Sequence, residues 1–211
     1  MQKTSSIPDT RQRLLGATMK LVSEKGYLGA TTREIAREAG VSELTLFRHF
    51  GSKEKLFLGM LGQYTFLPKM RELRPRLEGL SYEDALRTVA TRFLLTLKER
   101  KPFVKIIYSE VNLYPGKVRK AYAETMDDMR ATLADYFTSL KRQGVLRSFS
   151  AETAARMFLA MLFSYFRSEE IVRGVDITRA GRMERAVREI VDIFVHGTLG
   201  SANGRVRRKR S

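Results

Sequence analysis

The stretch TTREIAREAGVSELTLFRHFGSKEKLF, residues 31–57, decides the fold of the first part of this 211-residue chain. Thr31 and Glu34 stand in the S/T-x-x-E order of a capping box, which predicts a helix start. Gly40 then ends this helix, and Ser42 is a suitable cap for the next one. Gly51 ends that second helix. The stretch therefore predicts a short helix, a turn and a second short helix.

The second helix of this pair has one apolar side and one polar side. Leu46 and Phe50 are four residues apart and share a face, so we expect them to point inward. At about 100° per residue, Leu44, Thr45 and Arg48 then point outward. This pattern matches a helix-turn-helix, which places its second helix in the major groove of DNA.

The charge of the chain favours a polyanionic partner. There are 39 lysine and arginine residues against 23 acidic ones, which gives a formal net charge of +16, and the last eleven residues, SANGRVRRKRS, are strongly basic. Such a balance suits nucleic acid or an anionic membrane surface. The alternative is that the charge serves solubility alone.

The sequence lacks the residues that several classes of function require. There is no cysteine, the two histidines (His49 and His196) lie far apart in sequence, and there is no glycine-rich phosphate loop. We therefore predict no enzyme, no metal and no cofactor, although a site made of carboxylates alone stays open. The longest apolar run, residues 157–166, is about half of a membrane span, and the N-terminus lacks a signal peptide pattern. We expect a soluble, cytoplasmic protein with no membrane partner.

The rest of the chain also shows a helical pattern. Apolar residues recur at three- and four-residue spacing, which predicts an all-α fold of about nine helices. Lys25 and Gly26 are typical of the end of a first helix. Pro68 and Pro75 are expected to end or kink the helix that starts near residue 53, and a second capping box begins at Ser81.

The last two helical stretches carry more apolar surface than one molecule needs. Ser150 caps the stretch 151–172, whose centre is apolar on nearly every side, and the stretch 183–195 has a broad apolar face. Two such helices predict a homodimer in which four helices meet across a two-fold axis. An ordinary buried hairpin is the alternative.

The stretch 31–57 resembles the DNA-binding segment of the TetR family of bacterial transcriptional regulators. That segment typically reads as a threonine, a short helix ending in Ala-Gly-Val-Ser, then Thr-Leu-Tyr-x-His-Phe and a Lys-Glu pair, and the resemblance covers about residues 10–61. It implies an N-terminal three-helix DNA-binding head in residues 1–55. It also implies a larger helical body for ligand binding and dimerisation in residues 56–199, followed by a basic disordered tail in residues 200–211.

The resemblance implies which residues contact DNA. Thr31 and Thr32 suit a phosphate at a helix N-terminus, and Arg33 suits a guanine edge or a phosphate. Glu43 is expected to accept from a cytosine amino group and Leu44 to contact a thymine methyl. The residues implied to contact DNA are Thr31, Thr32, Arg33, Ser42, Glu43, Leu44, Thr45, Phe47, Arg48, His49, Ser52 and Lys53.

One position departs from the family pattern. Phe47 stands where the family usually has tyrosine. A phenyl ring lacks the hydroxyl that donates to a phosphate, so we expect this hydrogen bond to be missing. The ring is expected to pack on a deoxyribose or a thymine methyl instead.

The resemblance also implies a mechanism: a ligand-responsive regulator, acting as a repressor, that binds a pseudo-palindromic operator in double-stranded DNA as a homodimer. A small apolar or aromatic effector would release it, with Glu110 as a polar anchor. For each pocket residue, simple packing in the core is the alternative. The alternative function is a nonspecific basic nucleic-acid-binding or architectural protein without an effector. The residues expected to line the effector site are Phe66, Phe93, Phe103, Tyr108, Glu110, Tyr122, Met126, Met157, Phe158 and Met161.

Overall fold

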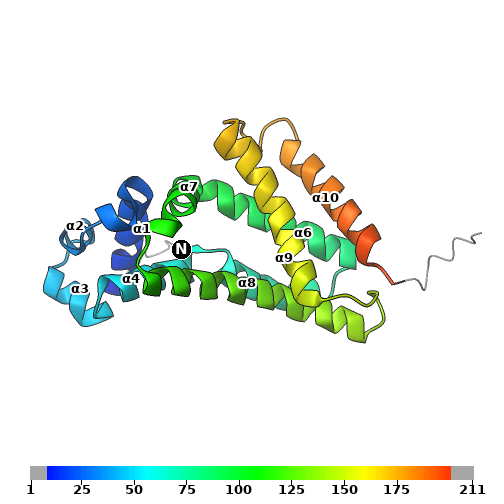
Figure 1. The fold of residues 1–211 in the computed structure, drawn as a ribbon, viewed down its shortest axis with the longest axis horizontal. Helices are drawn as coiled ribbons and strands as arrows, with labels where there is room; N and C mark the ends of the chain where they lie inside the picture. The colour runs from blue at the N-terminus through cyan, green and yellow to red at the C-terminus, as the bar shows by residue number, and fades with distance from the viewer. Residues whose placement is uncertain (1–8, 201–211) are drawn as a thin grey trace, which may run out of the picture. The chain divides into compact units, whose positions relative to one another are not determined.

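The structure is a computed structural model that describes residues 9–200. Within this range the chain forms ten α-helices, one 3-10 turn and one π-helical turn, with no β-strand (Figure 1). The predicted all-α fold is confirmed. The expected basic tail, apart from Gly200, lies outside the described residues. In residues 9–200 none of the helices combines the length and the apolar composition needed to span a bilayer.

Residues 9–68 and 100–126 form one compact unit. In this unit α1 packs against α2, α4 and α7, and α2 packs against α3. The core of the unit includes Leu14, Leu46 and Phe57, whose side chains are almost completely buried. Its elements are α1 (Thr10–Gly29), α2 (Thr32–Glu38), α3 (Glu43–Phe50), α4 (Lys53–Tyr64), α7 (Lys101–Glu110), the 3-10 turn η1 (Val111–Leu113) and the first part of α8 (Gly116–Arg142).

Residues 69–99 and 127–200 form the second compact unit. Here α6 packs against both α9 and α10, which lie side by side (Figure 1). The ring of Phe194 lies 4.9 Å from that of Phe158 and 5.7 Å from that of Phe137, measured between centroids. Its elements are most of α5 (Leu67–Leu77), α6 (Tyr82–Glu99), the rest of α8, α9 (Ala151–Phe166), the π-helical turn η2 (Arg167–Val172) and α10 (Arg182–Thr198).

Most helix starts lie where the capping residues predict them. The Ser81 hydroxyl accepts a hydrogen bond from the backbone N–H of Asp84 at 3.1 Å, directly before α6. The Ser150 hydroxyl accepts from the backbone N–H of Thr153 at 3.2 Å at the start of α9. Each cap satisfies a backbone donor that the helix itself leaves without a partner.

The expectation for the prolines was partly wrong. Helix α4 ends at Tyr64, before either proline. Pro68 is the second residue of α5, where a missing N–H costs nothing because no intrahelical acceptor exists there. Pro75 lies inside α5 and does not end it. Because α5 stops two residues later, at Leu77, the proline removes a hydrogen bond only from the last turn.

The sequence predicts that the first helix ends at Gly26, but α1 runs on to Gly29 and is only kinked at Gly26. Its backbone angles are φ 75° and ψ 172°, a region that is almost restricted to glycine. The glycine also permits a close approach. A Cβ atom at this position would lie 2.1 Å from Oε2 of Glu110, at the end of α7. The kink in α1 is therefore also the point where a carboxylate packs directly against the backbone.

Candidate nucleic-acid interface

A complete capping box fixes the start of α2. The Thr31 hydroxyl accepts from the backbone N–H of Glu34 at 3.2 Å, and the Glu34 carboxylate accepts from the backbone N–H of Thr31 at 3.2 Å. Lys25 Nζ lies 2.7 Å from Glu34 Oε1. The hydrogen bond from Lys25, followed by those from Thr31, lowers the pKa of Glu34 to about 2. The capping box predicted from the sequence is confirmed.

This capping box predicts an acid-sensitive contribution to stability. Because the pKa of Glu34 is lowered in the folded protein, its ionised form stabilises the fold above the ordinary value of 4.5. That contribution is lost as the pH falls toward about 2. We expect Glu34→Gln to destabilise the protein at pH 7, and the difference from wild type to shrink between pH 4.5 and 2. Urea unfolding at a series of pH values measures this, and a difference that does not vary with pH would contradict it.

Gly40 makes the turn between α2 and α3. Its φ is 66°, the left-handed region that favours glycine. The backbone N–H of Gly40 donates to Arg37 O at 3.1 Å, and that of Val41 donates to Ala36 O at 3.0 Å. These two bonds form a Schellman motif, which satisfies the carbonyls at the end of α2. Ser42 then caps α3, since its hydroxyl accepts from the backbone N–H of Thr45 at 3.1 Å.

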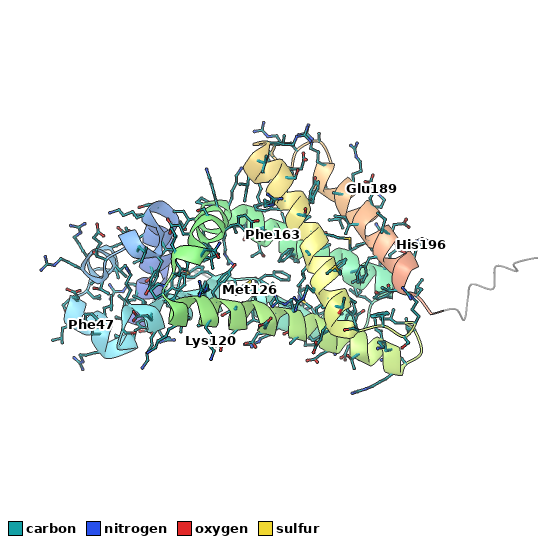
Figure 2. All side chains as sticks on the ribbon, in the orientation of Figure 1. Phe47, Lys120, Met126, Phe163, Glu189 and His196 are labelled. Carbon is teal, nitrogen blue, oxygen red and sulfur yellow. The ribbon has the colours of Figure 1, made fainter. Side chains whose placement is uncertain are left out.

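Helix α3 has the two faces that the sequence predicts. Leu46 and Phe50 are buried, at 0% and 7% exposed, and hold the helix against its unit. Leu44 is 71% exposed and Phe47 is 41% exposed; Phe47 is labelled on α3 in Figure 2. Arg48 is also exposed. The outer side of α3 therefore presents two apolar side chains and a guanidinium group.

Two cations and a histidine on or near α3 lie in solvent. Arg33, Arg48 and His49 are all exposed. Within residues 9–200, the guanidinium groups of Arg33 and Arg48 have neither an ion-pair partner nor a hydrogen-bond partner. These groups are consequently available to an anionic partner without first breaking an internal contact.

Two of the residues expected to contact DNA, Thr32 and Glu43, also join the two helices to each other. Oε1 of Glu43 accepts a hydrogen bond from the Thr32 hydroxyl at 2.5 Å, which joins the start of α3 to the start of α2. Thr45, expected to point outward, is only partly exposed, and its hydroxyl oxygen lies 2.9 Å from that of Ser42. Its position in the first turn places this hydroxyl beside the cap. Helix periodicity predicts neither contact, because each depends on side-chain rotamers.

Lys53 and Ser52 lie at the start of α4. Ser52 caps the helix by accepting from the backbone N–H of Lys55 at 3.2 Å. Lys53 Nζ lies 4.6 Å from the ring centroid of Tyr27 and 3.4 Å from the carbonyl oxygen of Leu28. Burial lowers the pKa of Lys53, against the opposing effect of nearby carboxylates. This contact was not predicted from the sequence. The signal for it is an aromatic residue, Tyr27, directly after the glycine that interrupts the first helix.

The residues expected to bind an effector are divided between the two units. Phe66, Phe93, Phe103 and Phe158 are buried, whereas Tyr108 and Met157 are 55% and 49% exposed. Glu110, Tyr122, Met126 and Met161 are partly exposed, and Met126 is labelled in Figure 2. Six of the ten lie in the first unit, and the other four, Phe93, Met157, Phe158 and Met161, lie in the second.

Comparison with known proteins identifies the class of protein that this helix pair defines. Residues 14–60 match the family profile of bacterial regulatory proteins of the tetR family, and residues 84–197 match that of the C-terminal domain of AefR-like transcriptional repressors. The chain therefore belongs to the TetR family of bacterial transcriptional regulators, which bind DNA through a helix-turn-helix. The predicted family is confirmed.

Individual relatives are similar to this protein along most of its length. The HTH-type transcriptional regulator YvkB of Bacillus subtilis is 32% identical over 157 residues, which cover 74% of this chain and 81% of that protein. The transcriptional repressor NicS of Pseudomonas putida is 28% identical over 167 residues, which cover 75% of this chain and 76% of that protein. The crystal structure of PfmR, a TetR-family transcriptional regulator from Thermus thermophilus, is 23% identical and superimposes with a TM-score of 0.61, covering 87% of this chain and 97% of that chain. The likeness to PfmR supports the fold.

Proposed function

We propose that this protein is a ligand-responsive transcriptional repressor that binds a pseudo-palindromic operator as a homodimer. The observation that carries the proposal is the outer side of α3, where Leu44, Phe47 and Arg48 are exposed on a helix capped at both ends. In a dimer, two copies of α3 would enter successive major grooves about 34 Å apart. We assign DNA binding to residues 1–55 and effector binding with dimerisation to residues 56–199.

The proposed contacts separate into positioning and reading. Thr31, His49 and Lys53, at or near helix ends, are assigned to phosphates, which fix the register of the protein on DNA. Leu44 and Arg48 are assigned to base edges in the major groove. Because the Glu43 carboxylate already accepts from Thr32, we assign it to holding the two helices together, with base contact secondary. Phe47 would pack against a sugar or a thymine methyl.

Two substitutions test this division. Lys53→Ala is expected to weaken binding to every DNA sequence about tenfold, and to lower the salt dependence of log K by about 0.9, because one phosphate contact is lost. Leu44→Ala is expected to relax selectivity at one base pair and to leave the salt dependence unchanged. Fluorescence anisotropy over a range of salt concentrations measures both. Lys105→Ala, an exposed lysine on α7, is the matched control. If the two variants changed affinity in the same way, the division would be wrong.

Exposed apolar side chains on α9 and α10 support the proposed dimer. Met157 on α9 is 49% exposed and Ile193 on α10 is 66% exposed. Figure 2 labels Glu189 and His196 along the same helix as Ile193. Exposed apolar side chains of this kind are stabilised when a second copy covers them. Light scattering should give about twice the 24.2 kDa chain mass, and Ile193→Glu should give the monomer mass. Leu113→Glu on η1, 67% exposed, is the control.

The proposed dimer has one arrangement that binds the operator and another that does not. The effector must bind the second arrangement more tightly, since equal affinity for both would not shift the equilibrium between them. Within the first unit, the expected effector residues Phe66 and Phe103 are buried aromatic side chains, which favours an apolar or aromatic compound. A thermal-shift screen tests this, because a ligand at about 100 times its Kd stabilises the folded state by about 2.7 kcal/mol. A nonspecific architectural protein would instead bind all DNA alike and respond to none of the compounds.

A further inference from the structure

Three buried aromatic rings meet in the first unit, and we call them the ring cluster. Tyr27 comes from the end of α1, Phe57 from α4, and Tyr114 directly follows η1. The centroid of the Tyr27 ring lies 4.8 Å from that of Phe57 and 5.3 Å from that of Tyr114, and the Phe57 and Tyr114 centroids are 5.9 Å apart. All three residues are at most 3% exposed. Tyr27 is therefore held from two sides by rings that come from distant parts of the sequence.

Lys53 contacts this cluster through Tyr27. Its ammonium group lies 4.6 Å from the Tyr27 ring centroid, within the range in which a cation is attracted to the face of a ring. Its second contact, to the Leu28 carbonyl, is long at 3.4 Å. The ring is thus the main internal contact that fixes where the ammonium lies, and the position of the ring depends on its two aromatic neighbours.

The segment that contains Tyr114 touches α1 at a second point. The Glu110 carboxylate packs against Gly26, with Oε2 only 2.1 Å from the position that a Cβ atom would take. That oxygen is buried and has no hydrogen-bond partner within residues 9–200. Residues 110–114 therefore contact both Gly26 and Tyr27, the two residues that precede the lysine's acceptor carbonyl. A change in this segment alters the support of the Tyr27 ring directly.

We propose that Tyr114 is a positioning residue for Lys53: it holds the Tyr27 ring in place, and this ring places the ammonium for its DNA phosphate. The inference rests on the proposed function of Lys53 as a phosphate contact. When the Tyr114 ring is absent, Tyr27 gains freedom and the lysine loses its fixed position. Binding DNA must then order the lysine side chain, which costs affinity.

A double-mutant cycle tests the inference. In the otherwise wild-type protein, Tyr114→Leu is expected to weaken DNA binding about three- to tenfold and to reduce the salt dependence by less than the ~0.9 expected for Lys53→Ala. In the Lys53→Ala background the same change should cause no further loss, since its effect passes through the lysine. Tyr114→Phe keeps the ring and should bind within about twofold of wild type.

A second measurement does not depend on DNA. Lys53 lies over the face of the Tyr27 ring, and protons over the face of an aromatic ring resonate upfield. Lysine-labelled NMR should therefore show an upfield-shifted Lys53 signal. That displacement should decrease in Tyr114→Leu and persist in Tyr114→Phe. Val118→Ala, in α8, removes buried volume from the same core and keeps all three rings, so it should leave the Lys53 signal unchanged and controls for general destabilisation.

Two results would overturn the inference. One is an equal loss of DNA affinity from Tyr114→Leu in both backgrounds, and the other is a Lys53 resonance that the substitution does not move. The proposed function fails separately. If wild type binds random and selected DNA equally, the repressor proposal is lost, while the cycle between Tyr114 and Lys53 is still measured on random DNA.

Discussion

Replacing Lys98 with methionine is expected to lower the free energy of unfolding by about 3 kcal/mol. Lys98 Nζ lies 2.7 Å from Oε1 of Glu170 and 2.5 Å from Oδ1 of Asp176, and the Glu170 side chain is only 1% exposed. Methionine keeps most of the volume of lysine but takes a cation away from a carboxylate that water does not reach. The expected loss of stability follows from that change. The substitution also removes the ion pairs that join α6 to the segment between α9 and α10.

Chemical denaturation of three variants checks this result. Lys69→Met breaks an ion pair with Glu72 in which both side chains are about half exposed, and should cost less than about 1 kcal/mol. Adding Glu170→Gln to Lys98→Met should recover most of the loss. Glutamine removes the buried charge and keeps the oxygen that accepts from the backbone N–H of Ile177 at 3.0 Å. A loss for Lys98→Met no larger than that for Lys69→Met would contradict the prediction.

Gly26→Ala is expected to cost about 2–4 kcal/mol, from two separate causes. Alanine is strained at φ 75° and ψ 172°, and its Cβ would lie 2.1 Å from Oε2 of Glu110. Adding Glu110→Ala should recover the steric part of the loss and leave the backbone part. The difference between the single and double variants therefore measures how firmly the Glu110 carboxylate is held.

A second glycine provides the control for this pair. Gly62 lies in α4, and a Cβ atom there would have no atom within 4 Å. Gly62→Ala should therefore raise stability by about 0.5–1 kcal/mol, as alanine does inside a helix. Thermal or urea unfolding compares the four proteins. If Gly26→Ala were as stable as the double variant, Glu110 would move aside freely, and the contact between residues 110–114 and α1 would not be fixed.

The local features of the fold were predictable because each depends on residues close together in sequence. Thr31 with Glu34, Ser42 and Ser150 satisfy donors in the first turn that directly follows them. Gly40 ends α2 through bonds that span only a few residues. The inward face of α3 followed from helix periodicity alone. Such signals also carried the family resemblance, since they make up most of its motif.

The contacts that the sequence analysis missed join residues distant in sequence or depend on one rotamer. The hydrogen bond from Thr32 to Glu43 is formed only when α2 and α3 have packed. The ring cluster brings Tyr114 to Tyr27, and no periodicity relates these two positions. The packing of residues 100–126 with residues 9–68 is a third example. Sequence patterns indicated which residues could reach DNA, whereas packing determined which of them are held by other side chains.

The central claim is that α3 reads a particular DNA sequence. The most direct measurement is a binding competition. DNA fragments from around the gene for this protein are bound in the presence of increasing random DNA, with wild type, Arg48→Ala and Leu44→Ala. We predict that wild type stays bound to one fragment in a large excess of random competitor, and that this preference is weaker in both variants. Equal displacement of every fragment by random DNA would contradict the claim and favour a nonspecific DNA-binding protein.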